Sequence, residues 1–224
     1  MEKDVKKLVE GYKKYTGNDF KVQKFPGAPG TTLSKTDLEE PYNINKYLSF
    51  VGKLMWYTTK VGPDVENASR ELAVHMSHPG PDHWKALGHL ISYIKGKENK
   101  GIITRNPKVL KAVMFCDSNY STEKEIRKSV SGLVTTIGGT LLTCLSKTQR
   151  TVTLSSTEEE YVTLSLCTQE VKFVGMLLGY TTKVQKPSGI YENNQGVIFL
   201  ENNRQVGIQT KSIHIRHHFL RDMV

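Results

Sequence analysis

The chain has 224 residues, a formal net charge of +9 from 31 basic and 22 acidic residues, and 38% hydrophobic residues. These values are ordinary for a globular protein with a sizeable core, and the positive charge favours polyanionic partners without proving one. Three isolated cysteines argue against a disulfide framework and a zinc site, and no signal peptide or membrane span is visible. We therefore expect an intracellular protein, cytoplasmic or nuclear. A basic protein without a nucleic-acid partner is the alternative.

Residues 1–35 predict a basic helix followed by an extended linker. Val5, Leu8 and Tyr12 recur at helical spacing among lysines in the first 15 residues. The stretch 25–35 contains two prolines and two glycines, which disfavour the interiors of helices and strands.

Residues 36–100 predict a small helical connection unit. Three helices are expected, at 44–58, 63–77 and 81–95. The first has a broad apolar face made of Tyr47, Leu48, Val51, Leu54, Met55 and Tyr57. Tryptophans at this spacing belong to the core far more often than to a ligand pocket, so Trp56 and Trp84 are given no functional role.

Residues 101–224 predict an α/β domain with a mixed sheet. Strands are expected at 111–116, 130–136, 141–145 and 188–191, and helices at 157–178, 195–200 and 212–222. The long helix has one apolar face made of Tyr161, Leu164, Cys167, Val171, Val174 and Leu178. Gly138-Gly139 predicts a hairpin turn between the second and third strands. The order β-β-β-α-β-α gives three antiparallel strands and a crossover helix that leads to the fourth.

Asp117 and Glu160 are candidate ligands of a divalent cation. Asp117 is expected at the end of the first strand, Glu160 in the first turns of the long helix, and Asn193 after the fourth strand. Side chains at these three places can meet in space, and two-metal phosphodiester hydrolysis needs several carboxylates around Mg²⁺. The structural alternative is that the run of acids at 158–160 stabilises the helix N-terminus, by about 0.3 to 1 kcal/mol for each residue.

Several longer motifs resemble the RNase H region of copia-type LTR retrotransposon polyproteins. These motifs are 116–117, 127–132, 146–165, 193–195 and 210–219. Upstream, the motifs 28–35, 51–56, 62–64, 83–86 and 93–96 resemble the end of the reverse transcriptase and its connection to RNase H in the same polyproteins. The resemblance covers nearly the whole chain. It implies an RNase H-like fold and Mg²⁺-dependent hydrolysis of the RNA strand of RNA–DNA hybrids, with Asp117 and Glu160 as metal ligands.

Two departures from the family pattern predict that catalysis is impaired. The third ligand position is Asn193, whose neutral carbonyl oxygen binds a hard cation less well than a carboxylate does. The fourth acid, with the last strand and helix, would come after Val224, so we expect a truncated domain. The chain is expected to cleave hybrids weakly or not at all. A non-catalytic nucleic-acid-binding or scaffolding module and a remnant without function are the alternatives.

Six basic residues are candidate contacts for nucleic acid. They are Arg127, Lys128, Lys147, Arg150, Lys211 and Arg216. In the family-like fold they could contact the phosphates of a hybrid without reading its sequence, although a solvated basic hairpin is the alternative. His214, His217 and His218 have a spacing that could serve a metal, but the interleaved basic residues favour a solvated helix. The expected partners are an RNA–DNA hybrid or other nucleic acid and the rest of a retroelement polyprotein, with no membrane.

Overall fold

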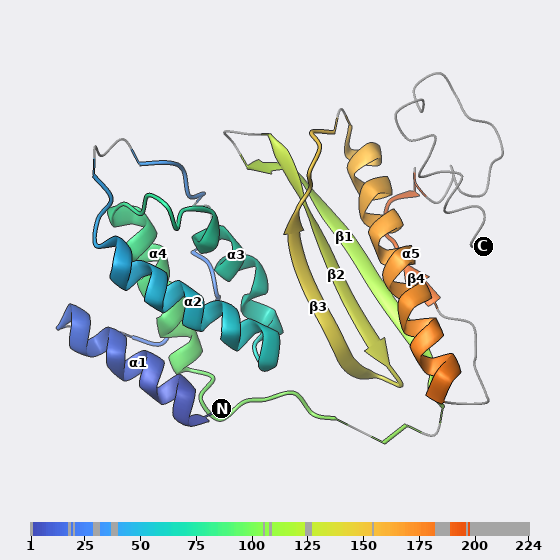
Figure 1. Cartoon of the computed structure of the whole chain (residues 1–224), viewed down its shortest axis with the longest axis horizontal. Helices are drawn as coiled ribbons and strands as arrows, with labels where there is room; N and C mark the ends of the chain where they lie inside the picture. The colour runs from blue at the N-terminus through green and yellow to red at the C-terminus, as the bar shows by residue number, and fades with distance from the viewer. Residues whose placement is uncertain are drawn as a thin grey trace. The chain divides into compact units, whose positions relative to one another are not determined.

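The computed structural model divides the chain into two compact units, Met1–Ile102 and Ile103–Val224, which we call the helical unit and the sheet unit (Figure 1). It describes residues 2–17, 19, 21–28, 32–36, 40–104, 106–107, 109–123, 127–153, 155–181, 189–195 and 197. Each unit has its own apolar core.

Helices make up the regular structure described in the first unit. They are α1 (Glu2–Thr16), α2 (Ile44–Lys60), the 3₁₀ turn η1 (Pro63–Val65), α3 (Glu66–Val74) and α4 (Pro81–Lys95). The predictions for α1, α2 and α4 are confirmed, the last with the same bounds. The single helix predicted over 63–77 is wrong, because Val65 has φ −107° and ψ 5°, which separates the 3₁₀ turn from α3. The chain then turns after Val74, well before the predicted end.

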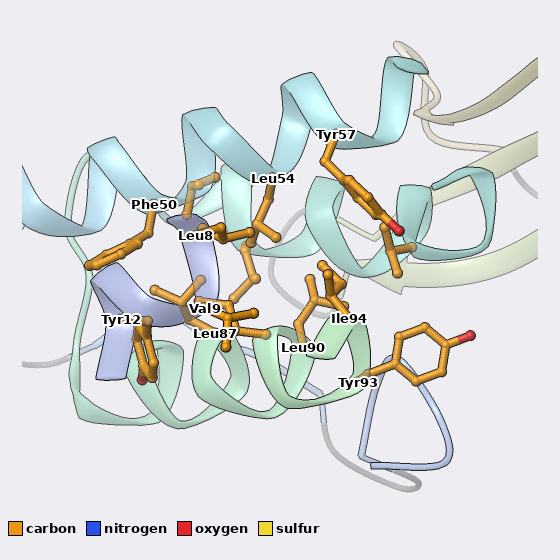
Figure 2. Close-up of a cluster of buried hydrophobic side chains, with 14 of the residues drawn as sticks. Leu8, Val9, Tyr12, Phe50, Leu54, Tyr57, Leu87, Leu90, Tyr93 and Ile94 are labelled. Atoms are coloured by element: carbon orange, nitrogen blue, oxygen red, sulfur yellow. The ribbon is translucent and has the colours of Figure 1, made fainter. Parts of the chain in front are cut away.

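Side chains from α1, α2 and α4 meet in the core of the helical unit (Figure 2). Those labelled in the figure are Leu8, Val9, Tyr12, Phe50, Leu54, Tyr57, Leu87, Leu90, Tyr93 and Ile94. Leu54, Leu87 and Ile94 are completely buried, and each aliphatic side chain removed from water contributes about 1.5 to 3 kcal/mol. The basic helix α1 therefore belongs to the same core as α2 and α4.

Part of the apolar face predicted for α2 lies at the surface. Leu48, Met55 and Trp56 are exposed by 36%, 44% and 47%. The burial prediction is wrong for these residues because the apolar positions cover a wider arc of the helix than its neighbours do. Trp84 is buried as expected, and its indole Nε1 donates a hydrogen bond to the Tyr42 carbonyl at 2.9 Å.

The predicted linker has no helix or strand at its described residues, 25–28 and 32–35. Two histidines of α4 contact its backbone. The Nε2 atoms of His89 and His83 lie 3.0 Å and 2.9 Å from the carbonyl oxygens of Phe25 and Ser34. These contacts hold the linker against the helical unit.

The sheet unit contains a mixed sheet of four strands in its described part, in the order β3-β2-β1-β4. The elements are β1 (Ala112–Glu123), β2 (Lys128–Ile137), β3 (Thr140–Thr148), α5 (Ser156–Thr181) and β4 (Gly189–Tyr191). The first three strands are antiparallel, and β4 is parallel to β1. The predicted α/β class, strand order and crossover helix are thus confirmed. A closing helix predicted at 212–222 lies outside the described residues, and that at 195–200 is described only at 195 and 197.

Strand β1 is longer than the sequence predicted. It continues through the polar residues after Asp117, which pairs with Gly132 of β2, up to Glu123, which pairs with Lys128. The expectation that Asp117 ends the strand is therefore wrong, because cross-strand hydrogen bonds extend a segment that lacks apolar alternation. The pairing becomes irregular between Asn119 and Glu123.

The turn between β2 and β3 follows the prediction. Gly138 and Gly139 have φ values of 56° and 79°, a combination that two-residue hairpin turns require and that glycine adopts without strain.

Helix α5 packs on β1 and β2 (Figure 1). Its predicted apolar face is confirmed, since Tyr161, Cys167 and Val174 are buried in the core against Met114 and the other residues of the sheet. Phe173, Met176 and Leu177 of the same helix are about half exposed. No helix among the described residues is long and apolar enough to span a bilayer.

Candidate metal and nucleic-acid site

Asp117 stands on β1 between two residues that face α5. Cys116 is buried in the core under the helix, and the Ser118 hydroxyl oxygen is buried as well. Asp117 itself is exposed to solvent, as the alternation of side chains along a strand requires. Its carboxylate is therefore accessible to a ligand from solution.

Glu158, Glu159 and Glu160 open α5 but differ in their surroundings. Glu158 lies at the capped end of the helix, where its backbone N–H donates a hydrogen bond to Ser155 Oγ at 3.1 Å. Glu159 and Glu160 are 2% and 6% exposed. The alternative that these acids only stabilise the helix N-terminus therefore fits Glu158 and does not account for the two buried carboxyls.

The carboxyls at this end of α5 share one electrostatic environment with Asp117. Burial, together with the negative charges of Glu192, Asp117 and Glu159, raises the pKa of Glu160 to about 7, against the lowering effect of the nearby Ser118 hydroxyl. Burial also raises the pKa of Glu159, and the Asp117 charge adds to this effect. Asp117 and Glu160 are therefore near enough to interact electrostatically, although Asp117 alternates with the residues of β1 that face α5.

Asn193 follows β4 and is exposed. The parallel pairing of Phe115 with Tyr191 puts Asn193 two residues beyond the last paired position, as Asp117 is on β1. The carboxylate of Glu192 accepts hydrogen bonds from the backbone N–H groups of Asn193 and Asn194, both at 2.9 Å. Asn193 thus occupies the expected place on the neighbouring strand, and its neighbour Glu192 brings a carboxylate there.

Three residues of this region were not singled out from the sequence: Ser118, Glu159 and Glu192. Ser118 Oγ, Glu159 Oε2 and Glu160 Oε2 are all buried without a hydrogen-bond partner. A signal for Glu159 was present, because three consecutive acids in a helix that packs on a sheet cannot all face solvent. No local pattern marks Ser118 or Glu192.

A buried glutamine fixes the start of α5 on the sheet. Gln149 Nε2 donates hydrogen bonds to Ser131 Oγ and to the Glu159 carbonyl at 3.0 Å, and lies 3.3 Å from Thr163 Oγ1. The hydroxyls of Ser131 and Thr163 are 2.6 Å apart. The Gln149 backbone N–H donates to the Ser129 carbonyl at 2.8 Å. These bonds connect β2, the end of β3 and α5 at the turn that carries the buried acids.

Four of the predicted basic residues lie where β2 begins and β3 ends. Arg127 and Lys128 precede or begin β2, and Lys147 and Arg150 lie at the end of β3. The antiparallel pairing of Ser131 with Lys147 brings these two strand ends together. Arg127, Lys147 and Arg150 are exposed, and Lys128 is half-buried. Lys211, Arg216 and the three histidines at 214, 217 and 218 lie outside the described residues.

Asp117 and Glu160 have the oxygen donors that a hard cation prefers, but they provide only two carboxylates. Among the described residues, no group of three or more His, Cys, Asp or Glu side chains is arranged to hold a metal ion. Asp117 and Glu160 provide two carboxylates, and the unpaired buried oxygen of Glu160 lacks a positive partner. Oxygen donors of this kind suit Mg²⁺ rather than a softer metal.

The chain is similar to transposon polyproteins along nearly its whole length. It is 29% identical over 231 residues to the retrovirus-related Pol polyprotein from transposon TNT 1-94 of Nicotiana tabacum, which covers 100% of this chain and 17% of that protein. It is 29% identical over 203 residues to the corresponding polyprotein from transposon RE1 of Arabidopsis thaliana, or 89% of this chain and 14% of that protein. The chain is similar over most of its length to copia-type retrotransposon Pol polyproteins.

This similarity confirms the resemblance to copia-type Pol polyproteins inferred from the motifs. Another relative is the secreted RxLR effector protein 161 of Plasmopara viticola, 37% identical over 124 residues, which is 55% of this chain and 87% of that protein. The chain spans only 17% and 14% of the two polyproteins named above. Their names do not specify an enzymatic activity for the region that matches. No family model and no solved structure matches the chain. The RNase H assignment therefore stays a proposal.

Proposed function

We propose that the sheet unit is an RNase H-like domain of a copia-type Pol polyprotein, with the RNA strand of an RNA–DNA hybrid as its ancestral substrate. The observation that carries the proposal is the burial of Glu160 at the start of α5 beside Ser118, the residue that follows Asp117 on β1. The RNase H resemblance assigns metal-ligand roles to the same two positions. The mixed sheet supports the proposal, because α5, which carries Glu160, packs on β1, which carries Asp117.

In this proposal Asp117 and Glu160 hold Mg²⁺ through their carboxylate oxygens. The bound cation would activate the attacking water and stabilise the leaving oxygen of the phosphodiester. Glu160 is half protonated near its pKa of about 7, so it must release a proton when the ion binds. The affinity for Mg²⁺ should therefore increase as the pH rises through about 7.

Asn193 is the reason to expect weak hydrolysis. Its amide offers one neutral oxygen where the resemblance calls for a carboxylate, so the site carries less negative charge for the same cation. A positive ion held more weakly also stabilises the charge that develops during phosphodiester cleavage less well. The proposed domain is therefore catalytically impaired.

The substrate would lie along the basic end of the sheet. Arg127, Lys147 and Arg150 are exposed there, and Lys147 pairs with Ser131, the neighbour of the Gly132 that pairs with Asp117. Contacts of lysine and arginine with phosphates orient a duplex without reading its bases. An A-form hybrid is recognised mainly through its shape and backbone in this way.

Cleavage of a labelled RNA–DNA hybrid on a gel tests the proposal. We expect little Mg²⁺-dependent cleavage by the chain itself and a clear gain with Asn193→Asp, which should disappear when Asp117→Asn is added. Asn194→Asp is the matched control, because it adds the same charge one position away. A folded Asn193→Asp variant that cleaves nothing would contradict the RNase H assignment. Strong cleavage by the unmodified chain, abolished by Asp117→Asn, would contradict the impairment.

A non-catalytic nucleic-acid-binding module is the second candidate. The gathering of Arg127, Lys128, Lys147 and Arg150 at one end of the sheet favours it. It predicts binding to hybrids that weakens steeply with salt and survives Asp117→Asn, since phosphate contacts release counterions without using the cation site. Binding that does not respond to salt, or no binding, would exclude this candidate. The same surface could serve a scaffolding role within the polyprotein.

A further inference from the structure

Three unpaired oxygens gather where α5 meets β1. Ser118 Oγ, Glu159 Oε2 and Glu160 Oε2 are buried and have no hydrogen-bond partner. The two glutamates are 2% and 6% exposed, and both carboxyls neighbour the Ser118 hydroxyl. These oxygens therefore face one small region between the strand and the helix.

This arrangement is unfavourable unless something positive occupies the region. Burying a polar atom costs its hydration free energy, which no hydrogen bond offsets when the atom has no partner, and the cost is larger for an ionised carboxylate. Among the described residues, no lysine or arginine forms an ion pair with Glu159 or Glu160. The Ser118 hydroxyl near both carboxyls and the Ser129 hydroxyl near Glu159 offset part of this cost, and a proton or a metal cation is left to compensate the rest.

We propose that Glu159 is a cation ligand in this chain, and that it forms with Glu160 and the Ser118 hydroxyl an all-oxygen pocket for one divalent ion of the Mg²⁺ and Mn²⁺ class. Two carboxylates balance the charge of such an ion, and hard cations prefer oxygen donors. Asp117 lies next to Ser118 on β1 and is exposed, so it opens the pocket to solvent. The inference rests on the proposed function in that both use Glu160.

Glu159 can replace the negative charge that the site lacks because of Asn193. The neutral amide of Asn193 removes one negative charge from the end of β4, and Glu159 adds one from α5. Cation binding then depends more on the helix than on the fourth strand. Binding and hydrolysis also become separable, because an ion held deeper under α5 need not lie where a hybrid is cleaved.

The backbone around Glu159 is fixed before any ion binds. Its carbonyl accepts hydrogen bonds from Gln149 Nε2 at 3.0 Å and from Thr163 Oγ1 at 3.1 Å. Its N–H donates to the Ser155 carbonyl at 3.2 Å. Ligands supported in this way need little reorganisation, which favours binding.

Calorimetric titration of the full chain with Mn²⁺ tests the inference, with Glu159→Gln as the decisive variant. The amide keeps the size of the side chain and removes its charge, so we expect Mn²⁺ affinity to fall about tenfold or more. Glu158→Gln, at the preceding residue, is the matched control. Its Mn²⁺ affinity should change by less than about twofold, because the Glu158 charge lies outside the pocket and is screened by solvent and salt. Ser118→Ala should weaken binding as well. A second readout is the rise in unfolding temperature of the sheet unit caused by Mn²⁺, which Glu159→Gln should remove.

The outcomes separate this inference from the proposed function. No Mn²⁺ binding by the chain, or equal binding by Glu159→Gln, would overturn the inference and leave two acids compensated by protons. Binding that needs Glu159, together with no hybrid cleavage by Asn193→Asp, would support the pocket and reject the RNase H assignment. Hybrid cleavage by Asn193→Asp together with unchanged Mn²⁺ binding by Glu159→Gln would support the RNase H assignment and reject the pocket. Should Glu159→Gln fail to fold, unaltered Mn²⁺ affinity of Ser118→Ala would still reject the pocket.

Discussion

The helical unit satisfies its buried polar groups more completely than the sheet unit does, although Ser69 Oγ is a buried atom of the helical unit without a hydrogen-bond partner. In the helical unit, Tyr12 and Tyr47 donate hydrogen bonds to backbone carbonyls at 3.3 Å and 3.0 Å, and Trp84 does so at 2.9 Å. In the described part of the sheet unit, five buried side-chain atoms lack a partner: Ser118 Oγ, Thr135 Oγ1, Gln149 Oε1, Glu159 Oε2 and Glu160 Oε2. A core that only has to hold a fold tends to satisfy its polar atoms, so the unsatisfied set points to a binding site.

The largest effect should come from an apolar truncation in the helical unit. Leu90→Ala removes a side chain that is 1% exposed, and the cavity should lower the free energy of unfolding by about 2 to 5 kcal/mol. Trp56 and Trp84 both belong to this unit, so tryptophan fluorescence during urea unfolding reports on it alone. Leu48→Ala makes the same chemical change at a residue that is 36% exposed and should cost less than about 1 kcal/mol. Equal losses would mean that the core lies elsewhere.

The two units should respond to pH in opposite directions. Burial lowers the pKa of His83 below 6.5, so its contribution to the helical unit is complete above pH 6.5 and is lost as the pH falls toward its folded pKa. Burial raises the pKa of Glu160 from 4.5 to about 7, so its contribution to the sheet unit is complete below pH 4.5 and is lost as the pH rises through about 7. A shift of this size corresponds to about 3 kcal/mol.

Unfolding at pH 5.5 and 7.5 measures this difference, with fluorescence for the helical unit and circular dichroism for the two units together. His83→Gln should reduce the pH dependence of the stability of the helical unit, and Glu160→Gln should reduce that of the sheet unit. Parallel slopes for the two units would refute the assignment of these residues to the pH response.

An intermediate effect is expected from Gln149→Leu. The change removes the Nε2 donor that contacts Ser131 Oγ, Thr163 Oγ1 and the Glu159 carbonyl, and it leaves those acceptors buried. We expect the sheet unit to lose about 1 to 3 kcal/mol, while the fluorescence transition of the helical unit stays unchanged. Gln169→Leu is the control, because Gln169 is exposed on α5. A loss of the same size in the control would show that the buried contacts are not the cause.

The smallest effect should come from Asp64→Asn in the helical unit. Asp64 Oδ2 accepts hydrogen bonds from Tyr93 and Lys97 at 2.5 Å and 2.6 Å. The Lys97 and Asp64 side chains are 30% and 39% exposed, so solvent screens the pair and the loss should stay below about 1 kcal/mol. Urea titrations at low and high salt should show the difference between variant and parent shrinking. A loss that persists in high salt would mean that the bond to Tyr93, and not the ion pair, provides the stability.

Local sequence patterns predicted the elements better than they predicted the site. Pro81 after Gly80 begins α4, and the paired glycines at 138 and 139 form the β2–β3 turn, because such signals act within a few residues. The polar half of β1 was missed because its strand conformation depends on β2, and the same cause moved Asp117 from the strand end to its interior. Asp117 and Glu160 were found through the family resemblance.

Glu159 and Gln149 illustrate what the sequence could not provide. A glutamate in the first turn of a helix is ordinarily a favourable partner of the helix dipole, and only the packing of α5 on the sheet shows that this one is buried. The role of Gln149 depends on acceptors at positions 131, 159 and 163, which the fold brings together across three elements. Polar contacts between distant segments have no periodicity from which to infer them.

The alkylation rates of the thiols can measure how often the sheet unit opens. All three cysteines belong to it and none forms a disulfide; Cys116 and Cys167 are buried and Cys144 is partly exposed. Cys167 Sγ lies 3.3 Å from Met114 Sδ, and Cys116 Sγ lies 3.2 Å from Glu192 Oε2. A neutral alkylating reagent should therefore modify Cys144 first and reach the other two only when α5 separates from β1. The rate of the slow step would report how tightly the helix is clamped, with and without added cation, in a single mass-spectrometry time course.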